Sequence, residues 1–277
     1  LALAAYAALT AVGVWTALVP LETRVVPVPL AGLPPALDGY RIALLSDVHV
    51  GLFTREARLH RIAAAVRAAR PDLVVLAGDL VDDEPRHIPK LARGLRGLAA
   101  RDGVYAVLGN HEIYANAAAH LLHRRDLPFR ILVNDAVRVE RPGGTLALVG
   151  LGELAAREAL RPRGPETLRL APDWERALQG TRPGDFLIAA AHRPELFAEA
   201  KRRGIPLMLA GHSHGGQFGI PRLRWCLSGL FLRWHMGLYR EGASALYVTT
   251  GVGYWVLPAR VGVPPEIVVL VLRAARR

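Results

Sequence analysis

The chain has 277 residues, so apart from about twenty N-terminal residues it has the length of one α/β domain of ordinary size. Its formal net charge of +11, carried mainly by arginine, indicates attraction to anionic surfaces, either lipid headgroups or nucleic acid. Aromatic residues are few and no zinc-finger or RNA-recognition consensus occurs, which argues against nucleic acid, and the single cysteine, Cys226, excludes an internal disulfide and is expected to be structural.

The first twenty residues contain no charged side chain and are long enough to cross a bilayer as one apolar helix. We therefore expect residues 1–20 to be a single N-terminal membrane anchor, which would place the protein at the cell membrane and leave the side of the domain undetermined. Two alternatives are a cleaved signal peptide, whose basic region would lie upstream of Leu1, and a helix packed on the domain.

Residues 21–40 contain Pro27, Pro29, Pro34 and Pro35, which predicts an extended linker or an edge strand before a domain over residues 41–277. Short apolar, β-branched runs then predict buried strands at 41–45, 73–77, 104–108, 186–191 and 205–210. Helical spacing predicts helices at 55–69, 89–100 and 113–125. The segments 130–133, 136–140 and 145–150 are separated by turn residues and predict hairpins, so two packed sheets with helices outside are expected.

Residues typical of metal ligands follow these strands. They are Ser46-Asp47-Val48-His49, Gly78-Asp79, Gly109-Asn110-His111-Glu112, His192 and Gly211-His212-Ser213-His214. Strands that end in this way bring polar side chains together at one edge of a sheet. Carboxylate, amide oxygen and imidazole donors suit manganese, iron or zinc, and the prominence of imidazole argues against magnesium or calcium.

This order of motifs resembles the calcineurin-like metallophosphoesterases, whose pattern is D-x-H, G-D, G-N-H-D/E, a lone His and G-H-x-H, and the match covers roughly residues 40–275. The resemblance implies a four-layer α/β/β/α sandwich with a dinuclear metal site at the C-terminal rim of the strands. It assigns one ion to Asp47, His49, Asp79 and His214. It assigns the other ion to Asp79, Asn110, His192 and His212.

The resemblance also implies a general acid and its partner. Two cations would polarise a phosphoryl oxygen and lower the pKa of a shared water, and the leaving alkoxide would need a proton. His111, which is not a ligand in the family, is the expected general acid, and Glu112 is expected to orient it through a hydrogen bond. The family more often has Asp at the position of Glu112.

Several residues have a second interpretation. His192 alone could be a surface or helix-capping residue, and Asp82, Asp83 and Glu84 are expected to form a solvated turn rather than a third metal site. The sequence Gly215-Gly216-Gln217 could close around the substrate or could form a tight turn. These alternatives stay open at the level of sequence.

The chain is similar in three further features to a bacterial, membrane-attached branch of the family, some members of which are assigned to cleaving a diacylglucosamine nucleotide in lipid A synthesis. The features are Gly215-Gly216-Gln217, the proline-containing end at 263–267 and the apolar N-terminus. Residues 218–239 alternate large apolar residues, including Trp225 and Trp234, with arginine. We expect this insertion to border the site and receive a lipid tail, and the alternative is a lid packed on the core.

Together these features predict a membrane-associated, dinuclear metallophosphoesterase that cleaves a lipid-linked phosphodiester or pyrophosphate, with an anionic membrane surface as its partner and no protein partner indicated. One alternative is a tethered phosphatase or phosphodiesterase of soluble phosphoesters. Another is a non-catalytic metal-binding interaction module. Loss of catalysis would be expected to replace ligands or His111, and none of these residues is replaced.

Overall fold

The structure is a computed structural model that describes residues 10–17, 21–82, 84–158, 165–220, 223, 225–256 and 258–275. Residues 10–17 are helical, whereas the other residues of the expected anchor, 1–9 and 18–20, lie outside the described residues. None of the helices in the described part of the chain combines the length and the apolar character that a membrane span requires.

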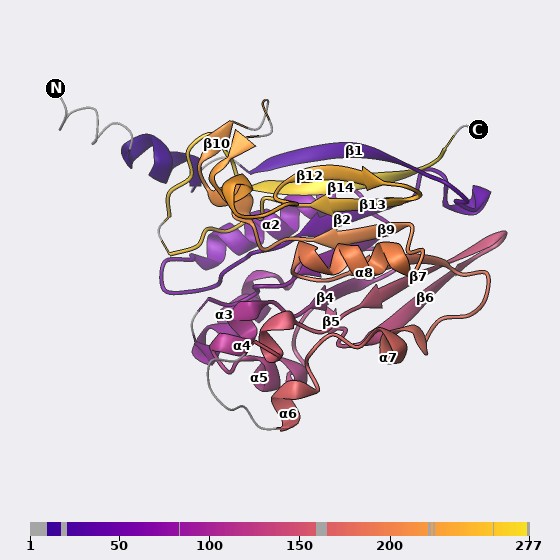
Figure 1. The fold of residues 1–277 in the computed structure, drawn as a ribbon. Coiled ribbons are helices and arrows are strands. Elements are labelled where there is room, and N and C mark those ends of the chain that lie inside the picture. Colours follow the sequence, from indigo (N-terminus) through magenta and orange to yellow (C-terminus); the bar gives the residue numbers. More distant parts are fainter. Residues whose placement is uncertain are drawn as a thin grey trace.

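Two six-stranded sheets form the centre of the described chain (Figure 1). The first sheet has the strand order β1-β14-β2-β3-β4-β5. Its strands are β1 (Glu22–Leu30), β14 (Glu266–Ala274), β2 (Arg41–Leu45), β3 (Leu73–Ala77), β4 (Val104–Val107) and β5 (Arg130–Ile131). Strands β2 to β5 are parallel, and β14 is antiparallel to β2. The segment expected as a linker or an edge strand is therefore an edge strand, paired in parallel with β14.

The second sheet has the order β12-β13-β9-β8-β7-β6. Its strands are β12 (Gly237–Glu241), β13 (Ser244–Val248), β9 (Leu207–Ala210), β8 (Phe186–Ala190), β7 (Gly144–Gly150) and β6 (Asp135–Arg141). The four inner strands are parallel, and both edge strands are antiparallel to their neighbours. Because parallel strands are usually buried on both faces, this sheet needs cover on each side.

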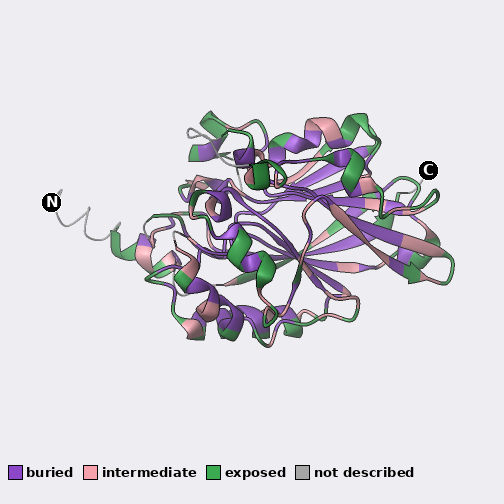
Figure 2. Cartoon of the chain, turned by 90° about the horizontal axis from the view of Figure 1, so that it is seen from below, coloured by how far each residue is buried: buried purple, intermediate pink, exposed green. Residues whose placement is uncertain are grey.

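Helices supply the outer cover of both sheets. The helices are α2 (Glu56–Ala68), α3 (Ile88–Gly94), α4 (Asn110–Tyr114), α5 (Ala118–His123), α6 (Pro165–Leu168), α7 (Trp174–Leu178) and α8 (Phe197–Arg202). One apolar core joins α2 to α5 with the first sheet, a second fills the space between the sheets, and a third joins α7 and α8 with the second sheet. The layers are thus helix, sheet, sheet, helix, and buried residues run through both sheets in Figure 2.

Most predicted elements are confirmed, with three differences. The helix expected at 113–125 begins earlier and is two helices, α4 and α5, because Asn116 has a φ of 52° that ends the first. The helix expected at 89–100 ends at Gly94. The segment 130–133 does not form a hairpin with 136–140, since β5 pairs with β4 in the first sheet.

Asn134 (φ 52°) marks the point where the chain crosses between the sheets. Its side-chain nitrogen donates to the carbonyl of Ala171 (2.7 Å), and its side-chain oxygen accepts from the backbone of Gly152 (2.8 Å) and Asp173 (2.9 Å). The turn residue that predicted a hairpin therefore fixes a connection between layers instead.

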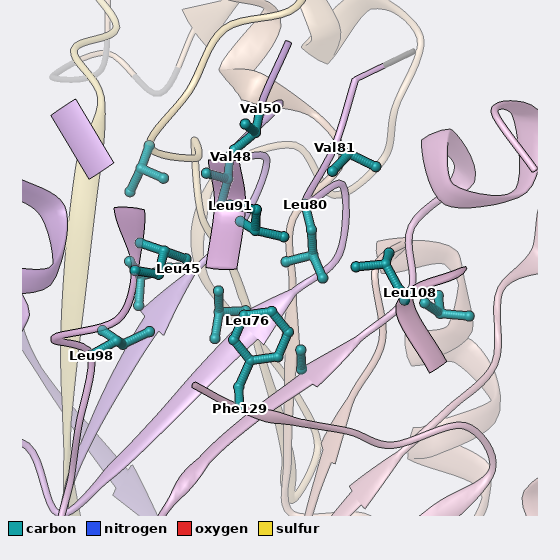
Figure 3. Close-up of a cluster of buried hydrophobic side chains, with 14 of the residues drawn as sticks. Leu45, Val48, Val50, Leu76, Leu80, Val81, Leu91, Leu98, Leu108 and Phe129 are labelled. Atoms are coloured by element: carbon teal, nitrogen blue, oxygen red, sulfur yellow. The ribbon is translucent and has the colours of Figure 1, made fainter. Parts of the chain in front are cut away.

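The loops beyond β2 and β3 continue side by side above the first core. The backbone nitrogens of Asp47 and His49 donate to the carbonyls of Gly78 and Asp79, each at 3.0 Å. These loops also carry four buried apolar side chains that pack into the first core, as Figure 3 shows: Val48, Val50, Leu80 and Val81. The apolar core therefore holds the loops that carry the first three predicted ligands.

Candidate metal centre

Every predicted ligand lies in a loop or helix start that follows a strand end. Asp47 and His49 follow β2, Asp79 follows β3, and Asn110 begins α4 after β4. His192 follows β8, and His212 and His214 follow β9. The two sheets therefore meet at one rim, and side chains up to 167 positions apart in sequence (47 to 214) share one site.

The first group of ligands consists of Asp47, His49, Asp79 and His214, which are all buried and whose ligand atoms lie within 4.8 Å of one another. The Nε2 atoms of His49 and His214 are 3.0 Å apart. His214 Nε2 is 3.3 Å from Asp47 Oδ1, and His49 Nε2 is 3.5 Å from Asp79 Oδ2. Two imidazoles and two carboxylates thus converge on one point, which suits a divalent cation.

The second group consists of Asp79, His192 and His212. His192 Nε2 lies 3.2 Å from Asp79 Oδ2, 3.2 Å from His212 Nδ1 and 3.1 Å from Asn110 Oδ1. Asp79 Oδ2 therefore faces both groups. A carboxylate shared in this way is the arrangement that bridges two ions in dinuclear hydrolases.

Hydrogen bonds orient the rings toward the centre. His192 Nδ1 lies 2.7 Å from the carbonyl of Ala77, and His49 Nδ1 lies 3.2 Å from Asp82 Oδ1. Because each partner is an acceptor, Nδ1 carries the proton and Nε2 presents its lone pair to the centre. Asp79 is held from the other side, where its Oδ1 accepts the backbone N–H of His111 at 2.9 Å.

The buried charges act strongly on one another. Burial alone would raise the pKa of Asp79, but the charges of His192 and His49 outweigh it and hold this pKa well below its usual range. Burial would lower the pKa of His192, yet Asp79 raises it to about 10. Burial and then the charge of His192 lower the pKa of His212 to about 3. His212 is therefore already neutral, whereas His192 must lose a proton when a cation binds, so protonation and metal binding compete at this centre.

The backbone of the site is strained where the ligands lie. Asp47, His49, Asp79, His212 and His214 all have positive φ, between 44° and 73°. Asp47 and His49 therefore do not continue β2 as a regular strand, and Val48 between them packs into the first apolar core. Such conformations cost about 1–3 kcal/mol each and persist at functional sites when the surroundings fix them.

Gly78 permits the close approach of two ligand loops. Its φ is +86°, and a Cβ atom at this position would lie 2.6 Å from His192 Nδ1. Any other residue would push the His192 ring away from the centre or strain the backbone.

Glu112 does not orient His111, so that prediction is wrong. The buried Glu112 carboxylate accepts four backbone N–H groups, from Asp79 (3.0 Å), Leu80 (2.8 Å), Val81 (3.0 Å) and Gly109 (2.7 Å). Glu112 therefore ties the loop after β3 to the start of α4. The family more often has Asp at position 112, and the longer Glu112 side chain contacts the backbone of residues 79–81 and 109 rather than the imidazole of His111.

The residue that contacts the His111 ring is Asp82 rather than Glu112. The sequence predicted that Asp82 lies in a solvated turn. His111 Nδ1 lies 2.6 Å from the carbonyl oxygen of Asp82 and 3.5 Å from its Oδ1. The same carboxylate contacts His49, whose ring centroid is 4.6 Å from that of His111. The spacing Asp79-x-x-Asp82 was the signal available, since the loop after β3 runs back along the site.

Arg260 is a second residue that sequence reasoning missed. It is fully buried and donates to the carbonyls of Gly253 (2.9 Å) and Thr250 (2.8 Å), and its Nη2 lies 3.4 Å from His214 Nδ1. Burial lowers the pKa of its guanidinium to about 10. The residue braces the loop behind His214, and no local motif marks it in the sequence.

The residues expected at a lipid tail fall into different environments. Gly215, Gly216 and Gln217 form a tight turn in which all three have positive φ. Trp225 is half exposed on β11 (Trp225–Cys226), which pairs with β10 (Gly219–Ile220). Trp234 is buried against Phe197, with its Nε1 donating to Glu241 (3.1 Å), so its expected lipid contact is wrong.

Comparison with known proteins agrees with this geometry. Residues 40–216 match the calcineurin-like phosphoesterase family, and the chain belongs to it. A Danio rerio transmembrane protein with metallophosphoesterase domain is 34% identical over 285 residues, covering 99% of the chain and 62% of that protein. The uncharacterized metallophosphoesterase YkuE of Bacillus subtilis is 27% identical over 247 residues, covering 87% of the chain and 82% of that protein.

The chain spans 62% and 60% of the lengths of its vertebrate relatives from Danio rerio and Bos taurus. Among solved structures, the NAD nucleotidase of Haemophilus influenzae superposes with a TM-score of 0.50 at 16% identity, covering 76% of the chain and 44% of that protein. This likeness shows a shared fold. The family and the convergent Asp and His side chains together define a calcineurin-like phosphoesterase domain with residues suited to two divalent ions.

Proposed function

We propose that the chain hydrolyses a lipid-linked phosphodiester or pyrophosphate at a membrane surface, with two manganese ions in its centre. The observation that carries the hydrolytic part is the shared Asp79 carboxylate, whose Oδ2 faces both ligand groups. The lipid part is supported by the apolar residues exposed around the site and by the net charge of +11.

The donor set fits two ions. One would be held by Asp47, His49, Asp79 and His214, and the other by Asp79, Asn110, His192 and His212. When bound, two such ions polarise a phosphoryl oxygen and make hydroxide available near neutral pH. Four imidazole donors favour manganese, iron or zinc over magnesium or calcium.

His111 would supply the proton that the leaving alkoxide needs. Its Nδ1 is held by Asp82, so Nε2 is the atom free to carry that proton. The Asp82 carboxylate would stabilise the protonated ring, and the side chain of His111 is partly exposed, which leaves it accessible to substrate.

An activity panel on the purified chain with added manganese tests the proposal. The substrates are an aryl monophosphate, an aryl phosphodiester, a cyclic nucleotide and a nucleotide-linked diacylglucosamine. We expect the lipid compound to give the highest kcat/KM. Activity on it no better than on the aryl diester would refute the lipid preference and leave a phosphoesterase of soluble substrates.

A further inference from the structure

Exposed apolar side chains gather on four segments of the described chain. Among the described residues, the exposed large apolar side chains other than Val25, Tyr114, Leu122 and Leu168 lie within residues 10–17, 52–53, 218–220, 223, 225–231 and 255–256. The most exposed on these segments include Leu52, Phe53, Leu230 and Phe231. Soluble proteins rarely expose so many large apolar side chains on neighbouring loops unless the surface binds something.

The four segments adjoin one another. Gln217 exchanges hydrogen bonds with the backbone of Trp255 (3.2 and 2.7 Å), which joins the turn before 218 to the loop at 255–256. Leu52, Phe53 and Tyr254 line one pocket, and the backbone of Arg260 donates to the carbonyl of Gly13 at 2.9 Å. The helix at residues 10–17 lies on the same side of the molecule as β10 in Figure 1.

Residues that flank three of these segments form hydrogen bonds with the metal centre. The hydroxyl of Thr54 donates to the carbonyl of His49 (2.8 Å), and the backbone N–H of Gly253 donates to the carbonyl of Asp47 (2.8 Å). The backbone N–H of Gln217 donates to the carbonyl of His214 at 3.1 Å. These three segments therefore lie beside the centre rather than on a remote surface.

The charge of this region favours an anionic partner. Residues 218–240 and 242–265 contain no Asp or Glu, and the exposed arginines Arg55 and Arg61 lie beside the segment 52–53. Arg233 is also exposed but is paired with Glu241 at 3.0 Å. Aromatic and aliphatic loop tips flanked by arginine suit the boundary between headgroups and acyl chains. Residues 1–20 carry no charged side chain, and the part of them that the structure describes, the helix at 10–17, belongs to this face.

We propose that this apolar face, made of residues 10–17, 52–53, 218–220, 223, 225–231 and 255–256, docks on the surface of an anionic bilayer so that the metal centre opens toward the headgroups. The proposal deepens the proposed function, on which it rests for the choice of substrate. The docking itself is measured without any substrate, so the two can fail separately.

Environment-sensitive dyes on single cysteines test the docking in the full chain. Leu52→Cys and Leu230→Cys place the dye on the apolar face, at side chains that are 72% and 64% exposed. Leu122→Cys and Leu168→Cys, 41% and 55% exposed, are the controls, and they lie on α5 and α6 at the bottom of Figure 1, away from β10. Cys226 is buried, so the introduced cysteine is the one that reacts.

With vesicles of phosphatidylcholine and phosphatidylglycerol, we expect a blue shift and protection from aqueous quenchers at positions 52 and 230 only. Water-like emission at all four positions would overturn the proposal. A blue shift that follows protein concentration and needs no vesicles would also overturn it, and would assign the face to a second copy of the chain.

Activity separates docking from catalysis. In the full chain, Phe53→Ser combined with Trp255→Ser should lower turnover of a vesicle-borne lipid phosphodiester by at least ~10-fold, because undocking lowers the local substrate concentration. The kcat/KM for a soluble aryl phosphodiester should stay unchanged. Equal turnover of the vesicle-borne substrate by the variant and the parent would argue against docking, whereas a dye shift without any lipid turnover would refute the proposed substrate alone.

Discussion

The carboxyl group of Glu112 should stabilise the two loops that meet at the centre, and burial raises its pKa to about 7. It accepts four backbone N–H groups from two loops, and both of its oxygens are used. In Glu112→Gln the amide oxygen can keep two of these bonds, while the NH₂ group faces the other two donors. Hydrogen bonds to a charged group contribute about 1.5–3 kcal/mol each, so losing two lowers the free energy of unfolding by about 3–6 kcal/mol.

That loss is a large share of the roughly 5–15 kcal/mol by which a domain is stable. Urea denaturation followed by circular dichroism measures it. The matched control is Glu140→Gln, whose carboxylate is exposed and paired with Arg138, and its effect should stay within about 0.5 kcal/mol. If Glu112→Gln kept the stability of the parent and lowered only kcat, the backbone role would be refuted and the orientation of His111 restored.

Four further results are expected. His111→Ala should lower kcat by ~10²–10⁴-fold while metal analysis still finds both ions, and loss of an ion would make His111 a ligand. Asp82→Ala should weaken metal binding by roughly 10–100-fold, measured by competition with a chelator, because it removes the acceptor of His49 Nδ1. Gly78→Ala should lower the unfolding free energy by more than about 1 kcal/mol in urea denaturation, since its φ is positive and His192 blocks a Cβ. Dialysis against a chelator should abolish aryl diester hydrolysis, and manganese should restore it better than magnesium.

The sequence predicted the ligands because their chemistry is local. Each ligand follows an apolar strand, and strand ends of a parallel sheet meet at one edge. The helix α2 was also predictable, since Leu59, Ile62, Ala63 and Val66 repeat at helical spacing and are all buried. Both results depend on residues that are close together in the chain.

The contacts that sequence reasoning missed depend on residues far apart or on backbone geometry. Glu112 accepts bonds from residues about thirty positions away, and Arg260 reaches a loop 46 positions earlier at His214. The burial of Trp234 against Phe197 depends on how the segment after β11 folds back over the second sheet. No local pattern in the sequence shows that Glu112 binds backbone rather than orienting a side chain, that Arg260 is buried, or that Trp234 is not exposed.

The strained backbone explains why two sheets are needed to build this centre. Five ligand residues have left-handed φ, and at about 1–3 kcal/mol each no isolated loop would hold them. The loop after β2 is held by bonds to the loop after β3, and that loop is held by Glu112. His192 and His212 arrive from the other sheet, and the His192 ring fits only because Gly78 lacks a side chain. The ligands of one ion therefore depend on the packing of both sheets.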